Sequence, residues 1–131
     1  MILRRFFLSL ACGSVLLTAA CGANGTPVVS LEQARDALQN ASARVIDIRE
    51  PNEHATGVAK GALLLPMSQL NRRIAELPAP GKEPFLLICN TQNRSSRVVE
   101  QLRAAGYSNV SYVNGGMSQW AARGWPMVKP Q

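Results

Sequence analysis

Cysteine, histidine and aromatic residues are scarce in this sequence. It contains three cysteines, one histidine, two tryptophans, two tyrosines and three phenylalanines in 131 residues. Three cysteines are too few for a framework of paired disulfides. The formal net charge is +6, but it is scattered, and Arg72-Arg73 is the only basic doublet beyond residue 20. Because no basic stripe alternates with aromatic residues, the composition gives no support for nucleic-acid binding.

Residues 1–20 are predicted to be a signal peptide of the lipoprotein type. Arg4 and Arg5 form a short basic start, residues 6–17 are mostly apolar, and small residues then lead to Cys21. This order is typical of a signal peptide, and the apolar stretch is shorter than the roughly 20 residues that span a bilayer. The last residues up to the cysteine resemble a bacterial lipobox. We therefore expect Cys21 to be the lipidated first residue of an exported protein.

The lipid is expected to hold the protein on a membrane, because each buried CH₂ group contributes about 0.8 kcal/mol. The expected location is the periplasm or the cell envelope. Two alternatives stay open, a soluble secreted protein cleaved near Ala20 and an uncleaved transmembrane anchor. Residues 21–27 are small and flexible and are interpreted as a tether. They lead to one domain, residues 28–131, since such a length suffices for a single compact core.

Short apolar strands alternate with helical periodicity through this domain. Strands are expected at residues 28–29, 44–49, 63–65, 84–88 and 110–113, and helices at residues 31–38, 68–77, 95–105 and 117–122. Ser30 and Gln33 form a capping-box pattern, and Ser68 is expected to cap the second helix. The alternation predicts an α/β fold, with a parallel sheet of about five strands and helices on both faces.

Cys89 is the residue most clearly marked for chemistry. The continuously apolar run before it is typical of a central parallel strand covered on both faces, and sites in open α/β sheets lie beyond the carboxyl ends of the strands. The polar residues after Cys89 lead into a helix, whose free N–H groups and dipole favour a thiolate. Arg94 adds a positive charge, and the thiolate is the nucleophilic form. The alternative is a buried, inert thiol.

Three segments of the domain together resemble the rhodanese family. They are Asp47–His54 with Gly57, Gly61 and Pro66; Cys89–Ser95; and Val113–Met117 with Trp120, Gly124 and Pro126. Each segment alone is moderate evidence, but all three occur in the family's order. The resemblance covers nearly the whole predicted domain and implies a rhodanese-like fold.

The resemblance implies a thiosulfate sulfurtransferase that works by ping-pong covalent catalysis. The nucleophile would be Cys89, which takes sulfane sulfur from thiosulfate or a persulfide donor and passes it to a thiol, or to cyanide in an assay. The groups implied to bind the donor or the persulfide are Asn90, Thr91, Gln92, Asn93, Arg94 and Arg49. Asp47 is expected to brace the loop, and Arg49 either anchors the Cys89 loop or binds the donor's charge. No metal ion or organic cofactor is implied, and the protein is expected to be a monomer.

Two positions depart from the family pattern. Val58-Ala59 stands where the family usually has His-Ile, and this pair is interpreted as structural. Gln92 stands where active members often have glycine, which tolerates positive φ without steric cost. If Gln92 is left-handed, its replacement by glycine is expected to ease the loop and raise the rate of sulfur transfer.

Two other functions stay open for this loop. One is a rhodanese-like binding module, or a persulfide carrier without turnover, which the Gln92 departure favours. The other is a small phosphatase or arsenate reductase. Those related enzymes have one more residue in the loop, whereas Arg94 here follows Cys89 by five positions, a spacing that fits a sulfur-sized group. His54, the only histidine, is expected to have a packing or surface role.

Overall fold

The computed structural model describes residues 20–21 and 25–131, so most of the predicted signal peptide lies outside the described residues. The elements in chain order are β1 (Ala20–Cys21), β2 (Pro27–Val29), α1 (Leu31–Asn40), β3 (Arg44–Asp47), α2 (Pro51–His54), β4 (Leu63–Leu64), η2 (Met67–Gln69), η3 (Ile74–Glu76), β5 (Phe85–Ile88), α3 (Asn93–Ala104), β6 (Val110–Val113) and α4 (Gly116–Ala122). Within the described ranges, none of these helices has the length and apolar character that a bilayer crossing requires.

One sheet runs through the molecule in the order β1-β2-β6-β5-β3-β4. The five strands β2, β6, β5, β3 and β4 are all parallel, which confirms the predicted α/β fold with about five parallel strands. The two-residue strand β1 adds an antiparallel edge that the sequence did not predict. Parallel strands place their carboxyl ends at the same edge of the sheet, so the residues that follow β3 and β5 come together there.

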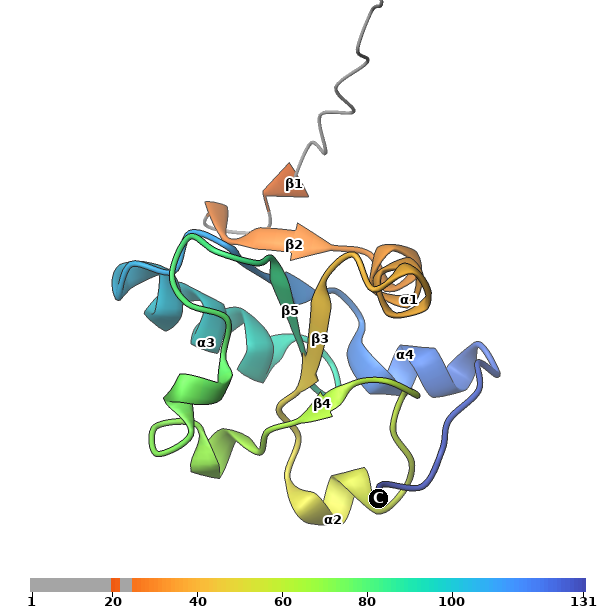
Figure 1. Ribbon diagram of the computed structural model, residues 1–131. Coiled ribbons are helices and arrows are strands. Elements are labelled where there is room, and N and C mark those ends of the chain that lie inside the picture. Colours follow the sequence, from red (N-terminus) through yellow and green to blue (C-terminus); the bar gives the residue numbers. More distant parts are fainter. Residues whose placement is uncertain (1–19, 22–24) are drawn as a thin grey trace, which may run out of the picture.

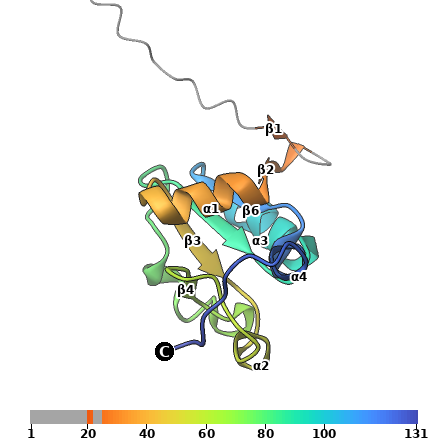
Figure 2. The same cartoon turned by 90° about the vertical axis from the view of Figure 1, so that its right-hand side faces the viewer.

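Helices cover both faces of the sheet, as Figure 1 shows, with α3 on one side and α1 and α4 on the other. Side chains alternate between the two faces along each strand. Ile46 and Leu87 therefore pack with the buried residues of α3, while the neighbouring Val45 and Leu86 pack with those of α1 and α4. Figure 2, which turns the molecule by 90°, shows α1 and α4 in front of the sheet. The two apolar layers hold β5 at the centre, where all four of its residues are buried.

Helix α1 begins as its sequence predicts. The hydroxyl of Ser30 accepts a hydrogen bond from the backbone N–H of Gln33, whose side chain accepts one from the N–H of Ser30. The chain just before it is packed rather than free, because Thr26 is buried and its hydroxyl donates to Glu100. The packed part of the domain thus includes Thr26 and Pro27.

The segment of residues 67–77 differs from its prediction. In place of one helix it forms two short 3-10 turns, η2 and η3. Ser68 does not cap a helix, because both its backbone N–H and its hydroxyl donate to the carboxylate of Glu50, at 3.0 and 2.7 Å. The apolar side chains of Leu70 and Leu77 are nevertheless buried. The periodicity therefore predicted which side chains face the core. It did not predict the backbone, which forms 3-10 turns with Ser68 bound to Glu50.

Candidate active site

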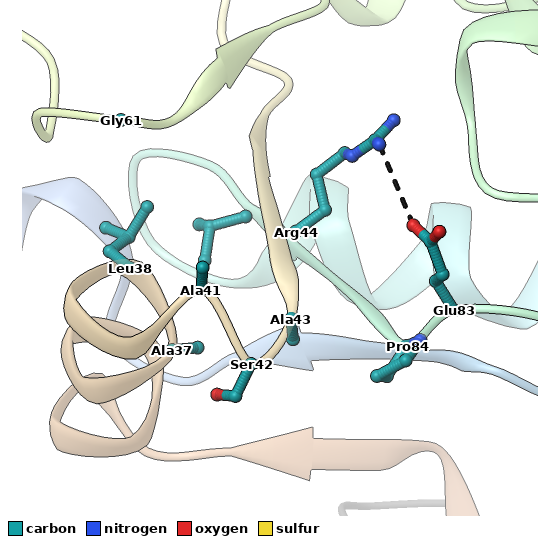
Figure 3. Close-up of a pocket in the computed structure, with 10 residues that line it drawn as sticks. Ala37, Leu38, Ala41, Ser42, Ala43, Arg44, Gly61, Glu83 and Pro84 are labelled. Carbon is teal, nitrogen blue, oxygen red and sulfur yellow. Dashed lines mark ion pairs between the residues drawn. The ribbon is translucent and has the colours of Figure 1, made fainter.

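Cys89 lies at the carboxyl end of the central strand β5. Its thiol is free and its side chain is 1% exposed. The hollow drawn in Figure 3 lies elsewhere, at the amino ends of β3 and β5, and has a volume of about 370 Å³. Its charged side chains, Arg44 and Glu83, pair with each other across 3.7 Å. The candidate site is therefore the Cys89 loop, at the opposite edge of the sheet.

The residues after Cys89 form a short loop into α3. Helix α3 begins at Asn93, two residues before Ser95, with Gln92 as its N-cap. Within the described parts of the chain, the backbone N–H groups of residues 90–95 have no hydrogen-bond acceptor. Unpaired N–H groups at a helix N-terminus, together with the helix dipole, stabilise a bound negative charge. The loop therefore offers an anion-binding backbone next to the sulfur.

Ser95 is a site residue that the sequence analysis missed. Its hydroxyl oxygen lies 3.4 Å from the Sγ atom of Cys89 and also donates to the carbonyl of Gln92 at 3.2 Å. Ser95 is 0% exposed, so this hydroxyl has few other partners. The signal was present in the sequence, because a serine in the first turn of the helix faces back toward the loop. It could be used only once the helix was known to begin at Asn93.

The N-terminus of α4 holds the loop from behind. The backbone N–H of Met117 donates to the carbonyl of Cys89 at 2.8 Å, and that of Ser118 donates to the carbonyl of Asn90 at 2.9 Å. The backbones approach so closely that a Cβ atom on Gly116 would lie 2.1 Å from the carbonyl oxygen of Thr91. Only glycine fits there, which explains why the third sequence segment carries a glycine at this point.

The structure corrects the interpretation of Gln92. Its φ is −149°, and among the described residues other than glycine only Ala41 has a positive φ. Gln92 therefore carries no left-handed strain, and the expected benefit of glycine at this position loses its premise. The side chain has a role of its own instead. Its amide oxygen accepts a hydrogen bond from the backbone N–H of Gly115 at 3.3 Å, which adds a third link between the loop and the start of α4.

Arg94 does not present a free positive charge to the loop. Its guanidinium donates two hydrogen bonds to the carboxylate of Glu53, at 2.7 and 2.6 Å. These bonds lower the pKa of Glu53 to about 2 and raise the pKa of Arg94. The sequence expectation of a full charge at Arg94 is corrected to a charge shared with Glu53. The ion pair joins the first sequence segment to the second.

Asp47 and Arg49 brace the first segment. The buried carboxylate of Asp47 accepts from the backbone N–H of Arg49 at 3.0 Å and from its guanidinium at 2.7 Å, as expected for a bracing acceptor. The guanidinium also donates to the carbonyls of Glu53 and Gly57. These partners all lie within residues 47–57, and the Arg49 side chain is 4% exposed. Neither proposed role of Arg49, anchoring the Cys89 loop or binding the donor, is found in these contacts.

His54 has the packing role that was expected of it. It is buried, with Nε2 at 3.4 Å from a carboxylate oxygen of Asp47. In the described residues, no three His, Cys, Asp or Glu side chains lie close enough together to hold a metal ion. The assembled candidate site is therefore the Cys89 sulfur, the Ser95 hydroxyl and the backbone of the loop.

Comparisons with known proteins agree with this geometry. Residues 30–123 match the family described as Rhodanese-like domain. The chain is 34% identical over 87 residues to a sulfurtransferase of Allochromatium vinosum, covering 66% of this chain and 79% of that protein. It is 29% identical over 108 residues to the human thiosulfate:glutathione sulfurtransferase, covering 73% of this chain and 94% of that protein.

A solved structure shows the same fold. The crystal structure of a rhodanese-related protein from Thermoplasma volcanium superimposes with a TM-score of 0.69 at 27% identity, covering 79% of this chain and 98% of that chain. The match covers only 53% of a Synechocystis protein and 63% of a Bacillus subtilis protein. The match therefore concerns one domain, from shortly after β2 to the end of α4.

Proposed function

Because this chain belongs to the rhodanese-like domain family, we propose that it is a sulfurtransferase in which Cys89 carries sulfane sulfur as a persulfide. The observation that carries the proposal is the position of the free Cys89 thiol. It follows the central strand, at the start of a loop whose backbone N–H groups are unpaired within the described chain. The relatives named as sulfurtransferases support the same reaction class.

The first half-reaction uses thiosulfate or a persulfide as the donor. The Cys89 thiolate attacks the outer sulfur of thiosulfate, a new S–S bond forms, and the original S–S bond breaks. Sulfite leaves with the electron pair of that bond, and the enzyme holds Cys89–S–S⁻. In the second half-reaction a thiolate or cyanide attacks the outer sulfur, and Cys89 leaves as a thiolate. No net electron transfer to an outside reagent is needed.

The protein's contribution is to hold the charged sulfur. Loop N–H groups stabilise a persulfide anion in the way that oxyanion-hole donors stabilise oxygen anions. The Ser95 hydroxyl joins them when it turns its single proton from the Gln92 carbonyl to the sulfur. The hydrogen bonds from Met117 and Ser118 keep the Cys89 and Asn90 carbonyls turned toward α4. The loop thus needs little reorganisation when charge develops on the sulfur.

The 1% exposure of Cys89 favours a second candidate. A sulfur this deep suits a rhodanese-like module that holds a persulfide or binds a partner without turnover. The two candidates differ in kinetics rather than in the modified residue. A persulfide projects its outer sulfur farther from the backbone than the thiol does, so the buried Sγ atom is compatible with transfer.

A thiosulfate:cyanide assay combined with intact mass spectrometry tests the proposal. The domain should gain the mass of one sulfur atom on exposure to thiosulfate, lose it on addition of cyanide, and release thiocyanate in repeated turnovers. Cys89→Ser should do none of these. A stable persulfide without repeated turnover would indicate the carrier module, and an unmodified wild-type mass would rule out both persulfide functions and leave a module that only binds a partner.

Export and lipidation are part of the same proposal. The support is the order of basic, apolar and small residues that ends at Cys21. Acyl chains on Cys21 would hold the sulfurtransferase domain at the surface of a membrane in the cell envelope, where it acts on small sulfur anions. In a bacterial host the wild type should fractionate with membranes and Cys21→Ala should not. Membrane association of both forms would indicate an uncleaved anchor, and a soluble wild type would indicate simple secretion.

A further inference from the structure

A groove of about 340 Å³ lies beside the candidate active site, between α3 and the segment that follows β4. Figure 1 shows this segment, in green, next to α3. The polar side chains along the groove are Asn71, Arg94, Arg97 and Gln101, and Met67 lies at its edge with 39% of its surface exposed. Positions 94, 97 and 101 share one face of the helix because they are three and four residues apart. The groove is therefore a mixed surface, polar along α3 and apolar along the turn.

The groove is continuous with the Cys89 loop. Arg94, the fifth residue after Cys89, belongs to both. Leu70 and Val98, which also line the groove, belong to the same buried apolar cluster as Cys89. The groove therefore adjoins the helical end of the Cys89 loop.

The groove is positively charged because of Arg97. The charge of Arg94 is balanced by Glu53, and no acidic residue is among the described residues that line the groove. Arg97, by contrast, has no ion-pair partner among the described residues, and it is exposed. An exposed guanidinium beside an apolar edge suits a ligand that combines a short aliphatic chain with a carboxylate.

Building on the proposed sulfurtransferase function, we propose that this groove binds the acceptor and selects a small thiol that carries a carboxylate. Arg97 binds the carboxylate, the amides of Asn71 and Gln101 donate to it, and Met67 and Leu70 contact the aliphatic part. The acceptor thiolate then attacks the outer sulfur of Cys89–S–S⁻. The S–S bond to Cys89 breaks, Cys89 keeps the electron pair as a thiolate, and the acceptor departs as a persulfide.

Acceptor kinetics on the full domain test this assignment. The probes are 3-mercaptopropionate, which carries a carboxylate, and the neutral 2-mercaptoethanol, each measured with thiosulfate as donor. Arg97→Gln should lower the ratio of kcat/KM for the charged thiol to that for the neutral thiol by up to about fivefold, the upper end of what one exposed ion pair contributes. Arg97→Lys should retain most of the preference, because it keeps the charge.

Arg103→Gln is the matched control. Arg103 lies on the same helix and is exposed, but it is outside the groove and donates to the carbonyl of Ser108. This variant should keep the wild-type ratio. High salt should remove the preference of the wild type, because the Debye length falls to about 3 Å at 1 M ionic strength.

Two failures can be told apart. If mass spectrometry shows a Cys89 persulfide but Arg97→Gln keeps the wild-type ratio, the groove assignment is wrong and the sulfurtransferase proposal stands. An equal loss of preference in Arg103→Gln would also overturn the groove assignment, because it would reflect net charge alone. If no persulfide forms on Cys89, the proposed function fails and the groove assignment fails with it.

Discussion

The guanidinium of Arg94 binds both carboxylate oxygens of Glu53, 41 positions away in the sequence, at 2.7 and 2.6 Å. Glu53 in turn accepts a hydrogen bond from the backbone N–H of Glu50 at 2.9 Å, which closes the capping box of α2. One carboxylate thus connects the start of α2 with the first turn of α3. The orientation of the Cys89 loop depends on this connection.

Glu53→Gln is expected to destabilise the domain at neutral pH by about 2 kcal/mol. The Arg94 hydrogen bonds lower the pKa of Glu53 from 4.5 to about 2, and one pKa unit corresponds to about 1.4 kcal/mol, reduced here by solvent screening of a partly exposed pair. Urea denaturation of both proteins across pH measures the difference. Because the folded-state pKa is depressed, the stabilisation is fully present above pH 4.5 and is lost as the pH falls toward 2.

The control for this prediction is Glu76→Gln. Glu76 also pairs with an arginine, Arg73, but the pair is more exposed and joins residues of a single turn. Its loss should change stability less than the loss of Glu53. Equal effects of the two substitutions would contradict the connecting role of Glu53.

Ser95→Ala is expected to slow sulfur transfer by about tenfold. The hydroxyl lies 3.4 Å from the Cys89 sulfur, and a hydrogen bond to a charged partner contributes about 1.5 kcal/mol or more. The matched control is Ser96→Ala, because the Ser96 hydroxyl donates to the carbonyl of Asn93 and makes no hydrogen bond to the sulfur. Steady-state rates and the fraction of persulfide by mass spectrometry separate the two. Similar rates for both variants would remove Ser95 from the site.

Gly116→Ala is expected to damage both stability and sulfur transfer. The new methyl group would lie 2.1 Å from the Thr91 carbonyl oxygen, at a φ of +62°. Gly124→Ala is the control, because its φ is +67° and nothing lies within 4 Å of the added carbon. The control should lose only about 1–2 kcal/mol of stability, which is the cost of a left-handed backbone at a residue other than glycine. Its transfer rate should be unchanged. Thermal melts and the thiosulfate:cyanide assay measure the two effects, and indistinguishable variants would contradict the close approach.

Gln92→Gly is expected to lower the melting temperature slightly and to bring no gain in transfer rate. The substitution removes the hydrogen bond to Gly115 and adds backbone freedom to the unfolded chain, which costs about 0.5–1 kcal/mol. Gln92→Ala removes the same hydrogen bond without the added backbone freedom, so its melting temperature should lie between those of the wild type and Gln92→Gly. A faster Gln92→Gly enzyme would show that the side chain restrains the loop.

The position of Cys89 at the end of a central strand was predictable because it depends on local composition. Residues 84–88 are continuously apolar, and only a strand covered on both faces accommodates such a run. The residue that ends it then has to lie at the carboxyl edge of the sheet. The alternation of short apolar strands with helical periodicity predicted the parallel sheet and the helices on both of its faces.

The partners of the site residues were not predictable from local patterns. Arg94 was interpreted from its distance to Cys89 along the chain, but its charge is decided by Glu53, which the fold brings alongside. Likewise, Ser68 was predicted to cap a helix, but in the structure its hydroxyl donates to the carboxylate of Glu50. A side chain with several possible acceptors binds the acceptor that tertiary packing brings close. Local sequence patterns do not predict which acceptor that is.

The close approach of Gly116 to Thr91 has a consequence for the order of events on the ribosome. The sulfur-bearing residue is synthesised well before α4, yet its loop is shaped by hydrogen bonds from Met117 and Ser118. In a nascent chain that has exposed Cys89 but not yet α4, the Cys89 loop lacks these hydrogen bonds. The loop around Cys89 therefore reaches its final geometry only after the last helix has been synthesised and has docked.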